Sequence, residues 1–184
     1  MIEQLPSRQE ALKILVQSGC SIPVIKHCKA VERLAVKIAE VCKGEGLNVD
    51  PSLVRIGALL HDVGRSKTHS VNHVIEGVRI AQSLGLPDPL VSIIGCHAGG
   101  GISIEEAKKL GWPPRRYVPQ TLEEKIVTYA DKLIEGSRKV EIEQTIEKFS
   151  RELGGNHPTI ERMKRLHEEF SLLIGDSNAR RHAT

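Results

Sequence analysis

The chain has 184 residues, of which 40% are hydrophobic and 27% charged, a composition typical of a single globular domain with an apolar core. The formal net charge of +3 argues against a protein whose main task is to hold nucleic acid electrostatically. No segment approaches the ~20 apolar residues of a membrane span and the first residues lack a signal-peptide core, so we expect no membrane partner and a cytoplasmic location.

Apolar residues recur with helical spacing along most of the chain, and only 3% of the residues are aromatic. Both features favour an all-α fold over a β-sandwich. In chain order, the first five helices are expected over about 7–19, 21–43, 50–62 and 71–84, and from Pro87 to the glycine run at 99–101.

Two capping boxes mark helix starts in the second half of the chain: Ser103 with Glu106, and Thr121 with Glu124. They predict a short helix over 104–110 and a longer helix that carries Asp131. Further helices are expected over 141–153 and 159–174. We expect 1–175 to form one domain and 176–184, which lacks periodicity, to be a mobile C-terminal tail.

Several helices place a histidine or an aspartate in line with their apolar stripe. In the second helix, for example, His27 lies four residues before Val31 and therefore faces the core. One such histidine is usually satisfied by a single hydrogen bond. A whole set left unpaired would cost several kcal/mol apiece, so we expect a metal site to collect them. The candidate metal ligands are His27, His61, Asp62, His73, His97 and Asp131.

His61 and Asp62 are adjacent, so both can point inward only near a helix end, where Gly64 allows a turn. Asp62 could then bridge two metals. Four neutral imidazoles and two carboxylates carry a charge of −2, and two divalent cations would leave a positive site that holds phosphate oxygens. The ligand types suit Fe, Mn, Co, Ni or Zn and disfavour a site for Mg alone. The four cysteines form no Cys-x-x-Cys pair and are expected to be buried or free thiols.

The segment LLHDVGR resembles the signature of the HD (HDIG) superfamily of metal-dependent phosphohydrolases. His27 upstream and Asp131 in YADKL are similar to the first histidine and the last aspartate of that family. His73, and His97 in IGCHAGG, resemble the further ligands of a six-ligand dinuclear subgroup that includes the bacterial diadenosine tetraphosphate hydrolases. The resemblance extends from about residue 22 to 138.

This resemblance implies a single-domain HD helical bundle with a buried dinuclear metal site. One metal would be held by four residues, namely His27, His61, Asp62 and Asp131. The other metal would be held by His73 and His97, and Asp62 would bridge the two metals. The implied function is hydrolysis of a phosphate ester or anhydride of a nucleotide-like substrate by a metal-bridging hydroxide. The two cofactors are expected to be divalent Fe or Mn, with Zn, Co or Ni as alternatives.

Asp62 and Arg65 are the candidate catalytic residues, and Arg65 would also neutralise a substrate phosphate unless it is a solvated arginine past a helix end. The segment 98–120 is longer than in the six-ligand subgroup. Its Arg115 and Arg116 could clamp a phosphate, with Trp112 or Tyr117 stacked on a base. The alternative is a rigid surface cover without substrate contacts.

Two other functions remain open at this stage. The same ligand set resembles that of mixed-valence di-iron oxygenases with an HD fold. A regulatory module could instead hold a nucleotide without cleaving it. A structural zinc site is the least expected, because such sites have four Cys or His ligands and no open coordination position.

A similarity to HD domains found near archaeal RNA-modifying proteins leaves a tRNA-related role open. The expected partner is a small phosphorylated molecule, and the sequence does not indicate the oligomeric state.

Overall fold

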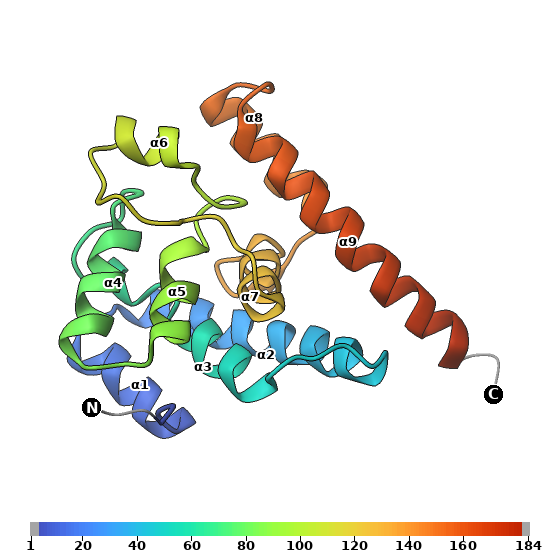
Figure 1. Ribbon diagram of the computed structural model, residues 1–184, viewed down its shortest axis with the longest axis horizontal. Coiled ribbons are helices and arrows are strands. Elements are labelled where there is room, and N and C mark those ends of the chain that lie inside the picture. The colour runs from blue at the N-terminus through green and yellow to red at the C-terminus, as the bar shows by residue number, and fades with distance from the viewer. Residues whose placement is uncertain (1–3, 182–184) are drawn as a thin grey trace.

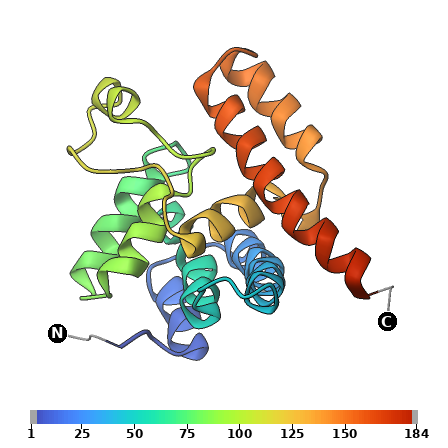
Figure 2. The same ribbon diagram turned by 45° about the vertical axis from the view of Figure 1, so that its right-hand side comes forward.

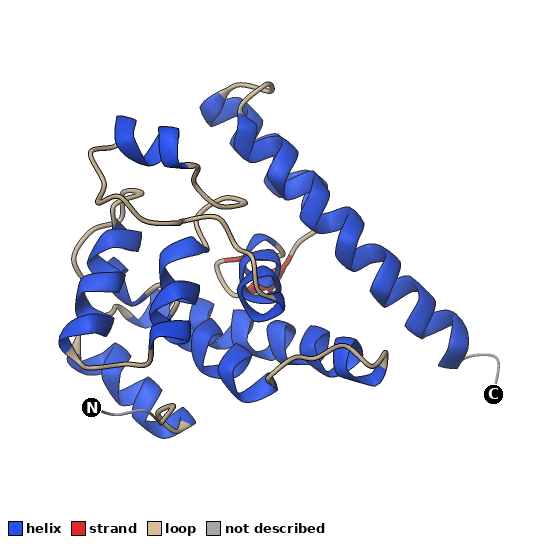
Figure 3. Cartoon of the chain, in the orientation of Figure 1, coloured by secondary structure: helices blue, strands red, loops and turns tan. Residues whose placement is uncertain are grey.

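Helices make up nearly all the regular structure of the described residues, 4–181, in a computed structural model (Figure 1, Figure 3). The first half of the chain contains α1 (Arg8–Gln17), α2 (Ile22–Gly44), α3 (Pro51–Leu60), the 3-10 turn η1 (Val63–Ser66), α4 (His73–Ser83) and α5 (Asp88–Cys96). The second half contains α6 (Ile104–Lys109), α7 (Leu122–Lys132), β1 (Ile134–Glu135), β2 (Arg138–Lys139), α8 (Ile142–Leu153) and α9 (Pro158–Arg181). The all-α prediction is confirmed.

The helix starts follow the local signals in the sequence. Ser103 and Glu106 bond reciprocally at the start of α6, with the Ser103 N–H donating to Glu106 at 2.6 Å. Thr121 and Glu124 form the same capping box at α7. Asp50 accepts hydrogen bonds from the first backbone N–H groups of α3. Because these caps satisfy otherwise unpaired donors, they define the start of each helix.

The core is built mainly from aliphatic side chains, as the scarcity of aromatic residues implied. One apolar cluster joins α2, α3, α7 and α9, and a second joins α1 to α5. In Figure 2, α8 and α9 lie side by side next to α7. Tyr129 of α7 stacks on Phe170 of α9 with 5.0 Å between ring centroids. Helix α7 therefore lies between the two halves of the chain. Among the described residues, no helix is both long and apolar enough to cross a membrane.

Gly64 allows η1 and α4 to pack unusually closely. A Cβ atom at Gly64 would overlap the carbonyl oxygen of His73 and the backbone nitrogen of Gly77. The Gly64 backbone is outside the left-handed region, so its role differs from the predicted turn. Glycine is required at position 64 because the backbones of η1 and α4 approach too closely to leave room for a side chain. This contact brings Asp62 next to His73.

Two segments differ from the prediction. The last helix was expected to end near 174, but α9 continues to Arg181, because extending an established helix costs little. Residues 182–184 lie outside the described part, and the mobility of the tail stays a prediction. The hairpin of β1 and β2 was not predicted, because two-residue strands are too short for an alternating pattern.

Candidate metal centre

The six predicted ligands lie together, although they come from five separate segments of the chain. His27 comes from α2 and Asp131 from α7, and the other four lie where α3, α4 and α5 begin or end. The buried members are His61, Asp62, His73 and His97. His27 and Asp131 are partly exposed. The cluster is therefore closed on one side and reachable from solvent on the other.

The cluster divides into two groups of facing atoms. In the first group, the Nε2 of His27 lies 2.9 Å from Asp131 Oδ1, and the Nε2 of His61 lies 3.5 Å from the same oxygen. In the second group, the Nε2 atoms of His73 and His97 lie 3.0 Å apart. Two triads have ligand atoms within 4.8 Å of one another; they are His27, His61, Asp131 and His61, Asp62, His97.

Asp62 lies between the two groups. Its Oδ1 atom is 3.2 Å from His73 Nε2 and 3.3 Å from His97 Nε2. Its Oδ2 atom is 3.7 Å from His61 Nε2 and 3.9 Å from His27 Nε2. Each carboxylate oxygen therefore faces a different pair of histidines, which is the arrangement that a bridging ligand requires.

The four imidazole rings are oriented by the backbone. Each Nδ1 atom lies 2.7 to 2.9 Å from a carbonyl oxygen, which can only accept a hydrogen bond. The carbonyls that accept from His27, His61, His73 and His97 belong to Gly136, Ala58, Ser70 and Ile94, respectively. Each Nδ1 therefore carries the hydrogen, and each Nε2 presents a lone pair to the cluster. Such orientation is typical of metal-binding histidines.

The residues present fit a metal. Within the described chain, His61 Nε2 and Asp62 Oδ1 are buried side-chain atoms without a hydrogen-bond partner. Both are acceptors, and leaving a buried acceptor unsatisfied costs free energy. A divalent cation coordinated by both atoms would remove that cost, and imidazole with carboxylate is a suitable donor set for transition metals.

The electrostatics of the cluster favour, for most of these groups, the protonation state that binds a metal, which is a neutral imidazole or an ionised carboxylate. Burial alone raises the pKa of Asp62, but the imidazoles of His61 and His97 outweigh it and hold the pKa well below the ordinary value. Burial and the neighbouring His97 lower the pKa of His73 to about 3. Burial also lowers the pKa of His97. The His61 pKa is raised, because Asp62 and Asp131 outweigh the effect of its burial. Neutral His73 and His97 beside an ionised carboxylate are ready to bind a metal.

Two cations border the cluster. The Nε of Arg65 donates to Asp62 Oδ2 at 2.5 Å, and the Nζ of Lys132 donates to Asp131 Oδ2 at 2.5 Å. Arg65 was expected near the site. Lys132 was missed because it lies off the apolar stripe, about 100° around the helix from Asp131. The basic residue directly after Asp131 was the one signal that could have indicated it.

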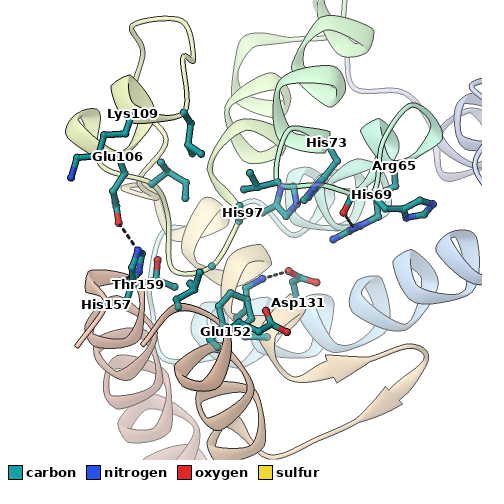
Figure 4. A pocket seen from close by; sticks show the side chains of 18 residues that line it. Arg65, His69, His73, His97, Glu106, Lys109, Asp131, Glu152, His157 and Thr159 are labelled. Carbon is teal, nitrogen blue, oxygen red and sulfur yellow. Dashed lines mark hydrogen bonds and ion pairs between the residues drawn. The ribbon is translucent and has the colours of Figure 1, made fainter. Parts of the chain in front are cut away.

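A pocket of about 480 Å³ opens beside the cluster (Figure 4). His73, His97 and Asp131 of the cluster belong to its lining. Part of the segment 98–120 lines it, including Ile102 and Leu110. His69, which is exposed, also lies in its wall. The pocket gives a ligand direct access to the metal centre.

The predicted substrate contacts of the segment 98–120 lie elsewhere. Arg116 forms a bidentate ion pair with the buried Glu124, in which its two terminal nitrogens donate to the carboxylate oxygens at 2.8 and 2.9 Å. Trp112 is buried and donates to Asn72 at 2.8 Å. Tyr117 is buried as well, with Arg115 over its ring. Among the described residues, none of these four side chains lines the pocket. Trp112, Arg116 and Tyr117 hold the segment to the core, and Arg115 packs on Tyr117.

All four cysteines are buried free thiols, as expected, and they are Cys20, Cys28, Cys42 and Cys96. Burial raises the pKa of Cys28 well above its ordinary value. The pKa of Cys96 is raised by burial as well. Neither thiol belongs to the metal-compatible groups found in the described part of the chain. Both therefore serve as small apolar core residues.

Comparison with known protein families gives a match to the HD domain over residues 24–136. An uncharacterized protein of Methanocaldococcus jannaschii is 47% identical over 166 residues, which cover 90% of this chain and 98% of that protein. A tRNA (cytidine(56)-2'-O)-methyltransferase of Thermoplasma volcanium is 39% identical over 174 residues, which cover 95% of this chain. The chain spans only about half of that enzyme, 49% of its length.

Among solved structures, the HD domain of the Listeria monocytogenes phosphodiesterase PgpH has a similar fold. The complex of that domain with cyclic-di-AMP gives a TM-score of 0.52 at 19% identity, and it covers 90% of this chain and 96% of the other. A second structure of the same domain gives a TM-score of 0.50 at 18% identity. At this identity, the likeness concerns the fold alone.

Proposed function

Because this chain belongs to the HD domain family, we propose that it is a metal-dependent phosphohydrolase with two divalent metals in the six-residue cluster. The position of Asp62 supports this proposal most strongly. Its two oxygens face two separate pairs of histidine nitrogens, at 3.2 to 3.9 Å. A single structural ion would not need a carboxylate with both oxygens directed in this way.

In this proposal, one metal is held by the group around His27 and Asp131, and the other by His73 and His97. Iron or manganese is the expected metal, with zinc, cobalt or nickel as alternatives, since mixed nitrogen and oxygen ligands suit all of these ions. When bound, two such cations supply a water activated near neutral pH and offset negative charge on phosphoryl oxygens. The partly exposed side of the cluster, at His27 and Asp131, leaves room for substrate.

Arg65 and Lys132 are proposed to bind and orient the substrate phosphate. Their side chains are 30% and 10% exposed, and both border the open side of the cluster. Each is already held by a carboxylate of the centre, which keeps the cation in place before substrate arrives. Charge-assisted hydrogen bonds from such fixed cations strengthen phosphate binding.

The proposed substrate is nucleotide-like. The pocket of about 480 Å³ is within the range of roughly 300–1,000 Å³ that small-molecule sites occupy. The PgpH domain, which shares the fold, forms a complex with the nucleotide cyclic-di-AMP. Two relatives named as tRNA methyltransferases, from Thermoplasma volcanium and Picrophilus torridus, support a setting near RNA modification. Binding of tRNA to the purified chain in a mobility-shift assay would test that setting.

A metal analysis combined with an anaerobic substrate panel tests the proposal. We expect about two transition metals per chain and metal-dependent release of phosphate or nucleotide without oxygen. Activity that needs oxygen would favour the di-iron oxygenase. A nucleotide recovered intact after long incubation with the metal-loaded protein would favour the regulatory module. Either result would contradict the hydrolase.

A further inference from the structure

A second pocket, of about 560 Å³, reaches the same cluster from another side. The first pocket contacts His73 and His97, whereas the second contacts His27 and Asp62. Asp131 and five other residues belong to both linings, namely Arg65, His69, Lys132, Phe149 and Glu152. Two ligand-sized pockets therefore meet at the metal centre, and the two proposed phosphate-binding cations lie in the wall between them.

The two pockets differ in the chemistry of their exposed surface. The surface of the first is mainly apolar, with Val71, Ile102, Leu110 and Leu153 in its lining. In the second, polar atoms make up a larger share of the surface, with Glu135, Gln144, Thr145 and Lys148 in its lining. An apolar pocket suits a flat, weakly polar group such as a nucleobase, and a polar pocket suits a hydroxyl-rich group such as a sugar.

The far wall of the first pocket is held in place by an ion pair. Arg162 of α9 donates to both carboxylate oxygens of Glu106 in α6, at 2.9 Å each. The Oε1 of Glu106 also lies 4.0 Å from the Nε2 of His157. Figure 4 marks this contact with a dashed line. These contacts join the segment 98–120 to the start of α9. The position of this wall is therefore set by contacts between two distant segments of the chain.

We propose that the substrate is a phosphodiester, with phosphorus at the shared wall and one organic group in each pocket. The inference rests on the proposed function. Water adds to phosphorus, the bond from phosphorus to one ester oxygen breaks, and that oxygen takes up a proton and leaves as an alcohol. The other product is a phosphomonoester. A phosphomonoester as substrate would use only one of the two pockets.

Paired variants of exposed residues test whether one ligand occupies both pockets. Leu110→Asp changes the first pocket and Lys148→Ala the second; Leu110 is 42% exposed and the Lys148 side chain 54%, so neither substitution removes a core side chain. The matched controls lie in or beside the same helices but outside both linings. They are Ile104→Asp, at a 56% exposed residue, and Arg151→Ala, at a 72% exposed side chain.

The readout is binding to the manganese-loaded protein, measured by titration calorimetry. The probes are a dinucleoside phosphorothioate, which resists cleavage, and a 5′-mononucleotide. We expect the affinity for the dinucleoside to fall at least fivefold in both pocket variants and to stay unchanged in both controls. The affinity for the mononucleotide should fall in at most one variant. Dinucleoside binding that is absent, or that depends on one pocket only, would overturn the inference.

Cleavage of the unmodified dinucleotide, measured separately, distinguishes this inference from the proposed function. Binding through both pockets without any cleavage would support the two-pocket phosphodiester ligand and contradict the hydrolase. Cleavage of the mononucleotide in preference to the dinucleotide would support the hydrolase and overturn the two-pocket substrate.

Discussion

The Nε2 atoms of His73 and His97 face each other at 3.0 Å, although each ring donates its Nδ1 hydrogen to a backbone carbonyl. Both facing atoms are therefore acceptors, and two lone pairs at this distance repel. A cation between or beside them converts the repulsion into two favourable bonds. The fold thus holds together an arrangement that a metal would stabilise.

Metal binding is expected to raise thermal stability. A ligand that binds only the folded state contributes about 2.7 kcal/mol per site at a hundred times its Kd. Two sites contribute about 5.4 kcal/mol, so for a chain of this size the Tm should rise by roughly 10–20 °C when manganese is added to chelator-treated protein. Differential scanning calorimetry measures the shift. An unchanged Tm would contradict metal binding at the cluster.

Asp62→Ala should affect both metal positions, because each oxygen of Asp62 faces a different group. We expect its metal content to fall from about two ions per chain to well below one, with loss of turnover. His73→Ala should lose about one ion. Metal analysis by mass spectrometry measures both, and Asp88→Ala, at an exposed position, serves as the control. Full metal content in Asp62→Ala would refute the bridging assignment.

Arg65→Ala should weaken catalysis without removing the metals. Charged hydrogen bonds contribute roughly 1.5–3 kcal/mol, so kcat/KM should fall about ten- to a hundredfold. Steady-state kinetics on the best substrate of the panel measures the loss. Lys67→Ala, which alters an exposed residue two positions along, should behave as the unaltered protein does. Equal effects of the two substitutions would show that Arg65 has no specific role.

Gly64→Ala should destabilise the fold, because the added methyl group would overlap the His73 carbonyl oxygen. The shift needed to relieve the clash is expected to cost at least ~3 kcal/mol of unfolding free energy. Urea denaturation measures the change. Gly44→Ala is the matched control, since nothing lies within 4 Å of the position its Cβ would occupy. A stable Gly64→Ala protein would show that η1 can move away from α4 at little cost.

Glu124 should contribute stability that depends on pH. Burial tends to raise its pKa, but Arg116 and backbone N–H groups outweigh this effect and lower the pKa from 4.5 to about 2. The contribution is therefore complete above about pH 4.5 and is lost as the pH falls toward 2. It amounts to about 3 kcal/mol at neutral pH.

The difference in unfolding free energy between the unaltered protein and Glu124→Gln measures this contribution. It should be largest near pH 6 and shrink below pH 4, with both proteins kept free of metal by a chelator. Glu105→Gln, at an exposed position of α6, should show no such trend. A difference that is constant with pH would mean that the charge of Glu124 is not responsible.

The sequence indicated the cluster because burial and periodicity are local properties. A histidine at a fixed helical distance from apolar residues must face the core, and a buried carboxylate needs a partner. His27 and Asp131, 104 positions apart, were therefore predictable as members of one site, and their side chains lie 2.9 Å apart. The capping boxes at Ser103 and Thr121 could be predicted for the same reason, because each is formed by two residues only three positions apart.

Contacts between distant segments could not be read in this way. The sequence does not show that Arg116 pairs with Glu124 instead of facing a substrate, because two nearby arginines in a loop have no periodicity to orient them. The same holds for Lys132, which turns back to Asp131, and for the direction of each oxygen of Asp62.

The sequence by itself determined the fold class and the identity of the clustered residues, since both follow from the spacing of apolar side chains along single helices. Only the tertiary structure decided how the cluster divides around Asp62, why Gly64 has no side chain, and where the two pockets open. These features depend on the distance between helix surfaces, and that distance results from the packing of the whole core.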